Sequence, residues 1–246
     1  MKQAPVLVKD EYYVYHGGKN RDAFDKDFQK LFYPIDINND GFEDFIYTGH
    51  SGGEGTEVTL ILNTGKTFKL LFKQNGYLQK LEFKDNKLFR VFVVDYGCCL
   101  DYINFNKVYQ LNYSASQVDV KVVYLTASIN TTHLPKEYFD RPVNFEVLNN
   151  GYKMRADPFI DDSTKNDRLI TGRTIKGNAI DTLDKGTKGR AIAAETDKTG
   201  RVWWLVEIDK NYTSYGDLFY EEPGNKIQLA SKMGWISSRY VKKLDN

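Results

Sequence analysis

Residues 36–44 carry the residue types and spacing of a loop that binds a hard cation. Calcium takes about six to eight oxygen ligands, and alternate residues of a tight loop can supply them. Oxygen-bearing groups occupy the first, third, fifth, seventh and ninth positions: Asp36, Asn38, Asp40, the carbonyl of Phe42, and Asp44. Gly41 stands at the sixth position, where a positive φ allows the chain to turn sharply. The sequence therefore predicts a structural calcium site, and the alternative is a turn rich in Asp, Asn and Gly that binds no metal.

The residues after the loop indicate that it joins strands. The twelfth position is Tyr47, whereas an EF-hand requires a bidentate Glu there. Residues 45–48 form an aromatic and β-branched run that is typical of a strand. The loop resembles the calcium loops of FG-GAP and VCBS-type repeats, which follow the pattern D-x-[DN]-x-D-G-x-x-D. This resemblance implies a calcium ion that stabilises β-structure in a secreted or adhesive protein.

Two segments could in principle carry a nucleophile. Residues 49–53 fit the pattern G-x-S-x-G, but a nucleophile elbow needs a helix after the serine, and residues 55–62 read as a strand. The adjacent Cys98 and Cys99 also follow a strand pattern, so no helix N-terminus is predicted to activate a thiolate. We expect these cysteines to be free thiols, since neighbouring residues lie too close for an unstrained disulfide. The protein is therefore expected not to be an enzyme.

Elements that could position these residues are mainly strands. Apolar and β-branched runs recur about every ten residues and are separated by turn residues such as Asn75 and Gly76. The expected strands span residues 58–62, 67–72, 77–83, 88–94, 107–111 and 119–124. This pattern predicts an antiparallel β-meander domain at residues 1–135, which carries the calcium-type loop. Together with the residues around Cys98, this part is similar to an N-terminal module of Bacteroidetes secreted proteins, which implies no particular activity.

The pattern changes in residues 136–246, which we expect to form a second domain. Its markers are Met154-Arg155 with Pro158, Leu183-Asp-Lys-Gly186, Trp203-Trp204, and Gly234-Trp235 followed by Tyr240. This series resembles the bacterial SH3 (SH3b) domain and implies a small SH3-like β-barrel that recognises cell-wall peptide or a protein partner. The chain departs from the SH3b pattern at residues 209–233, where an aromatic insertion replaces a short hairpin. The expected fold class is thus mostly β.

Aromatic side chains of the second domain are the candidate ligand-binding residues, because rigid rings supply contact area at low entropic cost. The candidates are Tyr152, Trp203, Tyr212, Tyr215 and Tyr220. Trp204 and Trp235 are assigned to the core, whereas Trp203 is expected to be exposed because side chains alternate along a strand. We expect a non-catalytic binding protein with a calcium cofactor. A partner-specific inhibitor or immunity-type protein and a cell-wall hydrolase remain alternatives.

Composition limits the other classes of partner. The chain has 246 residues and a net charge of +1, which offers no electrostatic basis for binding nucleic acid or an anionic membrane. No apolar run reaches the length of a membrane span, and the N-terminus shows no signal segment, which taken literally predicts the cytoplasm. Weak calcium loops are useful where free calcium is millimolar, outside the cytosol. We therefore expect a periplasmic or cell-surface location, with the signal peptide missing from this sequence.

Overall fold

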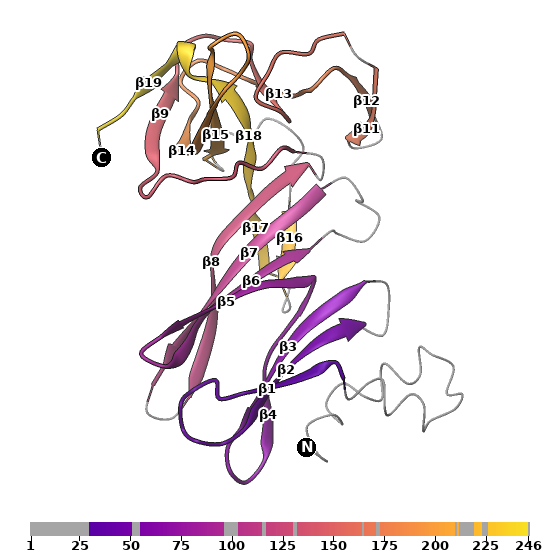
Figure 1. The fold of residues 1–246 in the computed structure, drawn as a ribbon, viewed down its shortest axis with the longest axis vertical. Coiled ribbons are helices and arrows are strands. Elements are labelled where there is room, and N and C mark those ends of the chain that lie inside the picture. The colour runs from indigo at the N-terminus through magenta and orange to yellow at the C-terminus, as the bar shows by residue number, and fades with distance from the viewer. Residues whose placement is uncertain are drawn as a thin grey trace. The chain divides into compact units, whose positions relative to one another are not determined.

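The computed structural model describes residues 30–50, 55–95, 103–114, 117–129, 132–163, 165–170, 173–209, 211, 219–222 and 226–245. For residues 165–170, 173–176, 219–222 and 226–229 it describes the backbone only. The described residues form strands and a short 3-10 helix (Figure 1), which confirms the mostly-β class. They divide into unit 1, Met1–Cys98 with Asn106–Tyr124, and unit 2, Cys99–Phe105 with Leu125–Asn246. The chain thus passes from one unit to the other after residues 98, 105 and 124.

Unit 1 contains two sheets. The first consists of β1 (Phe32–Ile35), β2 (Asp44–His50), β3 (Thr56–Asn63) and β4 (Phe68–Asn75), paired antiparallel in that order. The second consists of β5 (Tyr77–Lys84), β6 (Lys87–Asp95) and the unit 1 residues of β7 (Ile103–Tyr113) and β8 (Val118–Ile129), which are neighbours in chain order. All six strands expected in this part of the sequence are present.

Apolar side chains from both sheets of unit 1 pack into one core. Ile46 and Leu60 of the first sheet share a buried cluster with Leu88 and Val91 of the second. The rings of Phe72 and Tyr109 connect the same two layers, with centroids 4.5 Å apart. Unit 1 is therefore a two-layer β-sandwich. In β2 and β3 the opposite face is buried as well, because Phe45, Tyr47 and Ile61 form a second cluster with Phe32.

The turns of unit 1 show why the chain forms two sheets. Asp85 and Asn86 adopt φ values of 52° and 59° and close a two-residue hairpin between β5 and β6, as expected for such a turn. The expected turn at Gly76 has a different role. With φ at 128°, it passes the chain from β4 of one sheet to β5 of the other. A Cβ at this glycine would lie 2.7 Å from the Val94 carbonyl oxygen, so only glycine fits there.

Unit 2 contains the remaining strands of the described residues. They are β9 (Val143–Val147), β10 (Tyr152–Arg155), β11 (Lys165–Ile170), β12 (Arg173–Lys176), β13 (Ala179–Leu183), β14 (Lys188–Thr196), β15 (Val202–Ile208), β16 (Phe219–Glu222), β17 (Lys226–Leu229), β18 (Ser231–Ser237) and β19 (Val241–Lys243), with the 3-10 helix η2 (Ser238–Tyr240). Hydrogen-bonded neighbours run in the order β19–β9–β14–β15–β18, and β10 pairs with both β18 and β13. Between β13 and β19, the two ends of this path, the described residues form no strand pair, so no closed barrel is present. Within the expected 209–233 insertion, β16 and β17 form a hairpin, whereas residues 231–233 belong to β18.

Both faces of the sheet formed by β14, β15 and β18 are buried. Trp204 lies in the core on one face, beside Phe145, whereas Trp203 and Trp235 lie together on the other. The second face is covered in part by the segment that enters unit 2, where the Trp235 indole donates a 2.7 Å hydrogen bond to the His133 carbonyl. Trp203 is therefore only 1% exposed, and the prediction that it would be exposed is wrong. The alternation of side chains was correct, but it could not show that both faces would be covered.

Candidate binding groove and candidate metal loop

A groove of about 520 Å³ lies in unit 2, between the loop that follows β10 and the hairpin loop that joins β14 to β15. Eight residues line it: Pro158, Phe159, Ile160, Thr196, Asp197, Lys198, Thr199 and Arg201. One wall is apolar and is formed by the side chains of Phe159 and Ile160, which are 47% and 50% exposed. The other wall is polar and carries two cationic side chains. We refer to this feature as the 158–201 groove.

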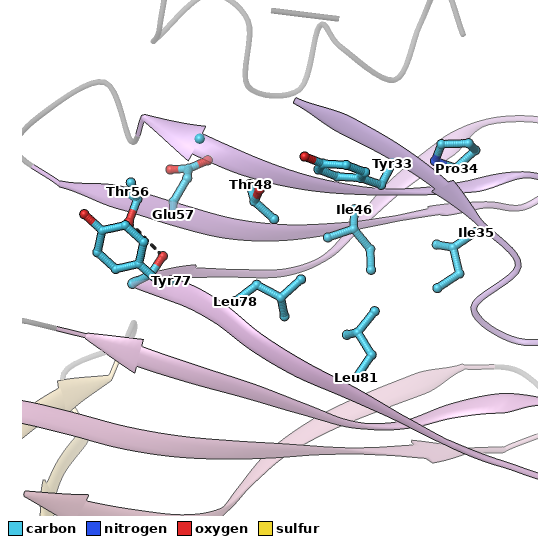
Figure 2. A pocket seen from close by; sticks show the side chains of 12 residues that line it. Tyr33, Pro34, Ile35, Ile46, Thr48, Thr56, Glu57, Tyr77, Leu78 and Leu81 are labelled. Atoms are coloured by element: carbon cyan, nitrogen blue, oxygen red, sulfur yellow. Dashed lines mark hydrogen bonds between the residues drawn. The ribbon is translucent and has the colours of Figure 1, made fainter. Parts of the chain in front are cut away.

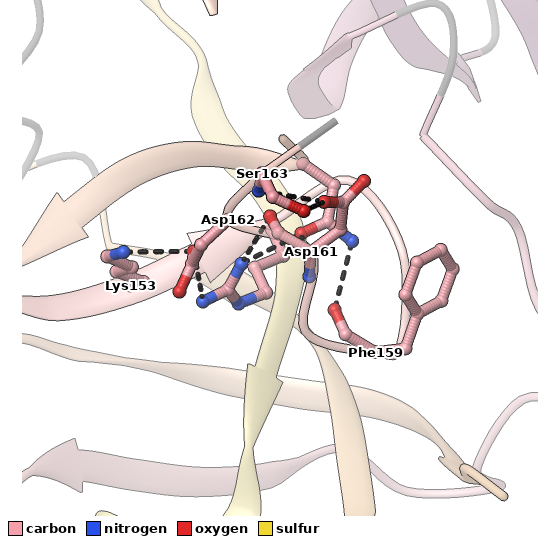
Figure 3. Close-up of polar contacts among 7 residues, drawn as sticks. Lys153, Phe159, Asp161, Asp162 and Ser163 are labelled. Atoms are coloured by element: carbon pink, nitrogen blue, oxygen red, sulfur yellow. Dashed lines mark hydrogen bonds and ion pairs between the residues drawn. The ribbon is translucent and has the colours of Figure 1, made fainter. Parts of the chain in front are cut away.

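A buried polar cluster holds the apolar wall in place. Asn178 is 1% exposed, and its side-chain oxygen accepts hydrogen bonds from Arg155 Nη1 (2.8 Å) and the Asp161 amide (3.2 Å). Its Nδ2 donates to the Phe159 carbonyl at 2.9 Å. Arg155, 4% exposed, also donates to the Asp161 carbonyl at 3.1 Å. The backbone that carries Phe159 is thus fixed from the interior, while the Phe159 ring faces outward (Figure 3).

The outer side of this cluster carries a charged group. Asp162 accepts hydrogen bonds from Lys153 Nζ (2.9 Å) and Arg155 Nη2 (3.0 Å), and Figure 3 shows the contact with Lys153. These two cations, Lys153 first, hold the pKa of Asp162 below its usual value. Gly177 adopts a φ of 74°, and a Cβ at this position would lie 2.1 Å from the Asp161 carbonyl oxygen. Only glycine therefore fits beside this loop. The loop is therefore specified by residues on both of its flanks.

The polar wall is organised around Asp197. Its Oδ1 accepts from the Thr199 amide (2.8 Å), the Thr199 hydroxyl (2.6 Å) and the Arg201 amide (3.1 Å). Its Oδ2 accepts from the Trp203 indole at 2.9 Å. These hydrogen bonds, led by that from the Thr199 side chain, hold the pKa of Asp197 far below its usual value. The carboxylate therefore shapes the hairpin and anchors Trp203 beneath the groove.

Neither of the predicted ligand-binding residues whose side chains are described, Tyr152 and Trp203, lines this groove. The half-buried Tyr152 donates its hydroxyl to the Ser237 carbonyl at 2.5 Å and packs edge-on against Tyr240, with ring centroids 5.9 Å apart. Burial raises the pKa of Tyr152, and the nearby charge of Arg201 partly offsets this effect. Trp203 lies beneath the surface, as described above.

Other predicted residues are not described in side-chain detail. Tyr212 and Tyr215, and the cysteine pair Cys98-Cys99, lie outside the described residues. Tyr220 belongs to β16, where only the backbone is described. The sequence interpretation missed Phe159, Ile160 and Arg201. A signal for the first two was present, since two large apolar residues follow Pro158 in a stretch rich in Asp, where a loop would be expected.

The predicted metal loop connects β1 to β2 in unit 1. Asp36 accepts from the amides of Asp40 (3.2 Å) and Gly41 (2.9 Å), and Gly41 has the expected positive φ, 84°. Asn38 Nδ2 donates to Asp40 at 2.8 Å, and the other Asp40 oxygen accepts from the Phe42 amide at 2.9 Å. The loop therefore wraps around its own side-chain oxygens.

The ninth position of the metal loop is buried. Asp44 is 0% exposed, and its two oxygens accept from the amides of Ile37 (2.7 Å) and Asn63 (2.6 Å). Burial, with smaller contributions from the negative charges of Asp40 and Asp36, raises the pKa of Asp44 to about 6. Three carboxylates thus repel one another here, which a divalent cation would relieve. In the described part of the chain, however, no group of three or more His, Cys, Asp and Glu side chains is gathered closely enough to hold a metal ion.

The metal loop is also tied to the second sheet of unit 1. The Ile37 carbonyl accepts a hydrogen bond from the Leu88 amide at 2.8 Å, and the Tyr113 hydroxyl contacts the carbonyls of Ile37 (2.8 Å) and Leu88 (2.7 Å). Ile37 itself is fully buried. If the loop became more or less rigid, the packing between the two sheets would therefore change.

A second cleft, of about 590 Å³, lies within unit 1 between the first sheet and β5. Its deeper side chains are aliphatic: Ile35, Ile46, Leu78 and Leu81 (Figure 2). Tyr33 and Tyr77 also line it and are 53% and 48% exposed. The lining also contains polar residues, namely Thr48, Thr56 and the buried Glu57.

No protein-family model, no curated protein and no solved structure matches the chain. The resemblances of the sequence to SH3b domains and to FG-GAP-type loops therefore stay predictions. Among the described residues, no helix has the length and hydropathy needed to cross a membrane.

Proposed function

We propose that this protein is a non-catalytic binding protein that acts outside the cytoplasm and holds a peptide segment in the 158–201 groove. The observation that carries the proposal is the exposure of Phe159 and Ile160 on a loop fixed by the buried pair Arg155 and Asn178. Apolar side chains held in position lose little entropy when a partner covers them. A groove of about 520 Å³ lies within the usual size range of ligand-binding pockets, about 300–1,000 Å³.

The sequence resemblance to SH3b domains suggests that the peptide belongs to the cell wall or to a protein partner. The residues that carry this resemblance lie on several elements of unit 2. Met154 and Arg155 are in β10, Trp203 and Trp204 in β15, and Tyr240 in η2. Arg155 and Trp203 both support walls of the groove, which links the resemblance to the proposed site.

Calcium is proposed as a structural cofactor of unit 1. The residues that would hold it are Asp36, Asn38, Asp40 and Asp44 with the carbonyl of Phe42, which are oxygen ligands of the type that calcium prefers. A bound ion would neutralise the repulsion between the carboxylates. Because Ile37 and Tyr113 tie the loop to the second sheet, this would stabilise the sandwich.

A non-catalytic role is supported by the chemistry of the groove. The residues that line it include no histidine and no cysteine. Its only carboxylate, Asp197, accepts four hydrogen bonds and stays ionised, so it is a poor general base. In unit 1, the segment that contains Ser51 is followed by strand β3, whereas a nucleophile elbow requires a helix.

The experiment is a pull-down of the full chain on purified peptidoglycan. We expect retention of the wild type, and loss of retention in the double variant Phe159→Ser, Ile160→Ser. The matched control is Leu134→Ser, which changes a residue that is 57% exposed and does not line the groove. If the wild type stays in solution, the cell-wall assignment is wrong and the partner-specific inhibitor becomes the leading hypothesis. If both variants bind equally well, the groove is not the binding site.

A further inference from the structure

The charges on the polar wall of the 158–201 groove are unevenly distributed. The lining contains two cations, Lys198 and Arg201, and one carboxylate, Asp197. Four donors from its own hairpin and from Trp203 already surround the Asp197 oxygens. Within the described part of the chain, neither cationic side chain forms an ion pair. The groove therefore offers positive charge that the protein does not itself neutralise.

Arg201 is held in place without using its hydrogen-bonding capacity. Its guanidinium lies over the Trp203 ring, 5.7 Å from the ring centroid. The Nε atom is buried and has no hydrogen-bond partner among the described residues. A guanidinium carries several donors in a planar fork that matches a carboxylate in a bidentate arrangement. The cation–π contact with Trp203 restrains the Arg201 side chain before a ligand arrives, which reduces the entropic cost of binding.

We infer that the 158–201 groove recognises a peptide carboxylate that adjoins an apolar side chain. Arg201, assisted by Lys198, receives the carboxylate, while Phe159 and Ile160 contact the apolar side chain. The two walls line the same groove, so a single short segment can contact both. This inference rests on the proposed function and specifies its ligand. The carboxylate could be a side chain or a chain terminus, since both present the same planar anion.

The test uses the full chain and three synthetic peptides, with binding measured by titration calorimetry. The first is acetyl-Ala-Pro-Leu-Glu-amide, with a side-chain carboxylate. The second is acetyl-Ala-Pro-Leu-Gln with a free C-terminus, and the third is its amide, which has no carboxylate. We expect at least one acidic peptide to bind about tenfold more tightly than the neutral one, as expected for charge-assisted hydrogen bonds. Higher salt concentration should reduce this preference.

Variants locate the effect. Arg201→Gln should abolish the preference for acidic peptides, whereas Lys242→Gln, which removes an exposed cation of β19 away from the groove lining, should retain it. If Arg201→Gln fails to fold, Arg201→Lys serves instead: it keeps the charge but loses the planar fork, and should lose most of the preference. Lys198→Gln should weaken it by a smaller factor.

The outcomes separate this inference from the proposed function. Equal affinity for all three peptides, or an unchanged preference in Arg201→Gln, overturns the carboxylate assignment while leaving the groove as a binding site. Failure of all three peptides to bind also overturns it. If the wild type is, in addition, not retained on peptidoglycan, the cell-wall assignment of the proposed function is wrong as well.

Discussion

Removal of the Asn178 side chain tests whether the buried polar cluster holds the apolar wall of the groove. Asn178→Ala deletes one hydrogen bond with a charged partner, Arg155, and two with the backbone of Asp161 and Phe159. A neutral hydrogen bond contributes about 1 kcal/mol and one with a charged group about 1.5–3 kcal/mol. Arg155 keeps its contacts with Asp161 and Asp162, so the loss lies towards the lower end. We expect the free energy of unfolding to fall by about 3 kcal/mol.

The measurement is urea denaturation followed by tryptophan fluorescence. All three tryptophans of the chain lie in unit 2, so the signal reports the unit that contains the mutation. The matched control is Asn150→Ala, which removes an exposed side chain with a single hydrogen bond, to the Lys185 amide. We expect this control to cost about 1 kcal/mol or less.

A third variant separates stability from loop position. Asn178→Asp keeps an acceptor for Arg155 but replaces the donor to the Phe159 carbonyl with a second oxygen, which would repel it. It should therefore cost less stability than Asn178→Ala, yet still weaken peptide binding in the groove. If Asn178→Ala were no more destabilising than Asn150→Ala, the cluster would not hold the loop, and the proposed rigidity of the apolar wall would be wrong.

Three further results are expected. Excess calcium should raise the melting temperature of the wild type but not of Asp40→Ala, with a stabilisation of about 2.7 kcal/mol at a concentration 100 times the dissociation constant; no shift in the wild type would contradict a calcium site. Tyr113→Phe removes a hydroxyl that contacts the Ile37 carbonyl and should cost about 1 kcal/mol in chemical denaturation; an unchanged midpoint would show that this link is unimportant. Burial raises the pKa of Glu207 from 4.5 to about 7, although the Arg190 guanidinium contacts its carboxylate and favours the ionised form. The free energy of unfolding should therefore fall as the pH rises between these values; Glu207→Gln should flatten this decline, and equal pH profiles would refute the assignment.

Local sequence determined the strands and their turns. Apolar and β-branched runs specified β3 to β8, although β3 buries both of its faces. Asp85-Asn86 specified a tight hairpin because both residues tolerate positive φ. The order of residues 36–44 specified a loop that folds around its own oxygens, since Asp36 reaches amides four and five residues later. These features depend on neighbours in the chain, which a sequence displays directly.

Contacts between distant segments decided the remaining features. Gly76 marks a turn in the sequence, but only the packing of two sheets made it the crossing point between them. Alternation along the strand correctly assigned Trp203 to the face opposite Trp204. Its burial, however, depends on residues that cover this second face of the sheet. The 158–201 groove joins loops about forty residues apart, and the buried partner that fixes one of them, Asn178, lies in neither loop. Burial and hydrogen bonding across such separations depend on the packing of the whole unit. They therefore cannot be predicted from the local pattern of residues.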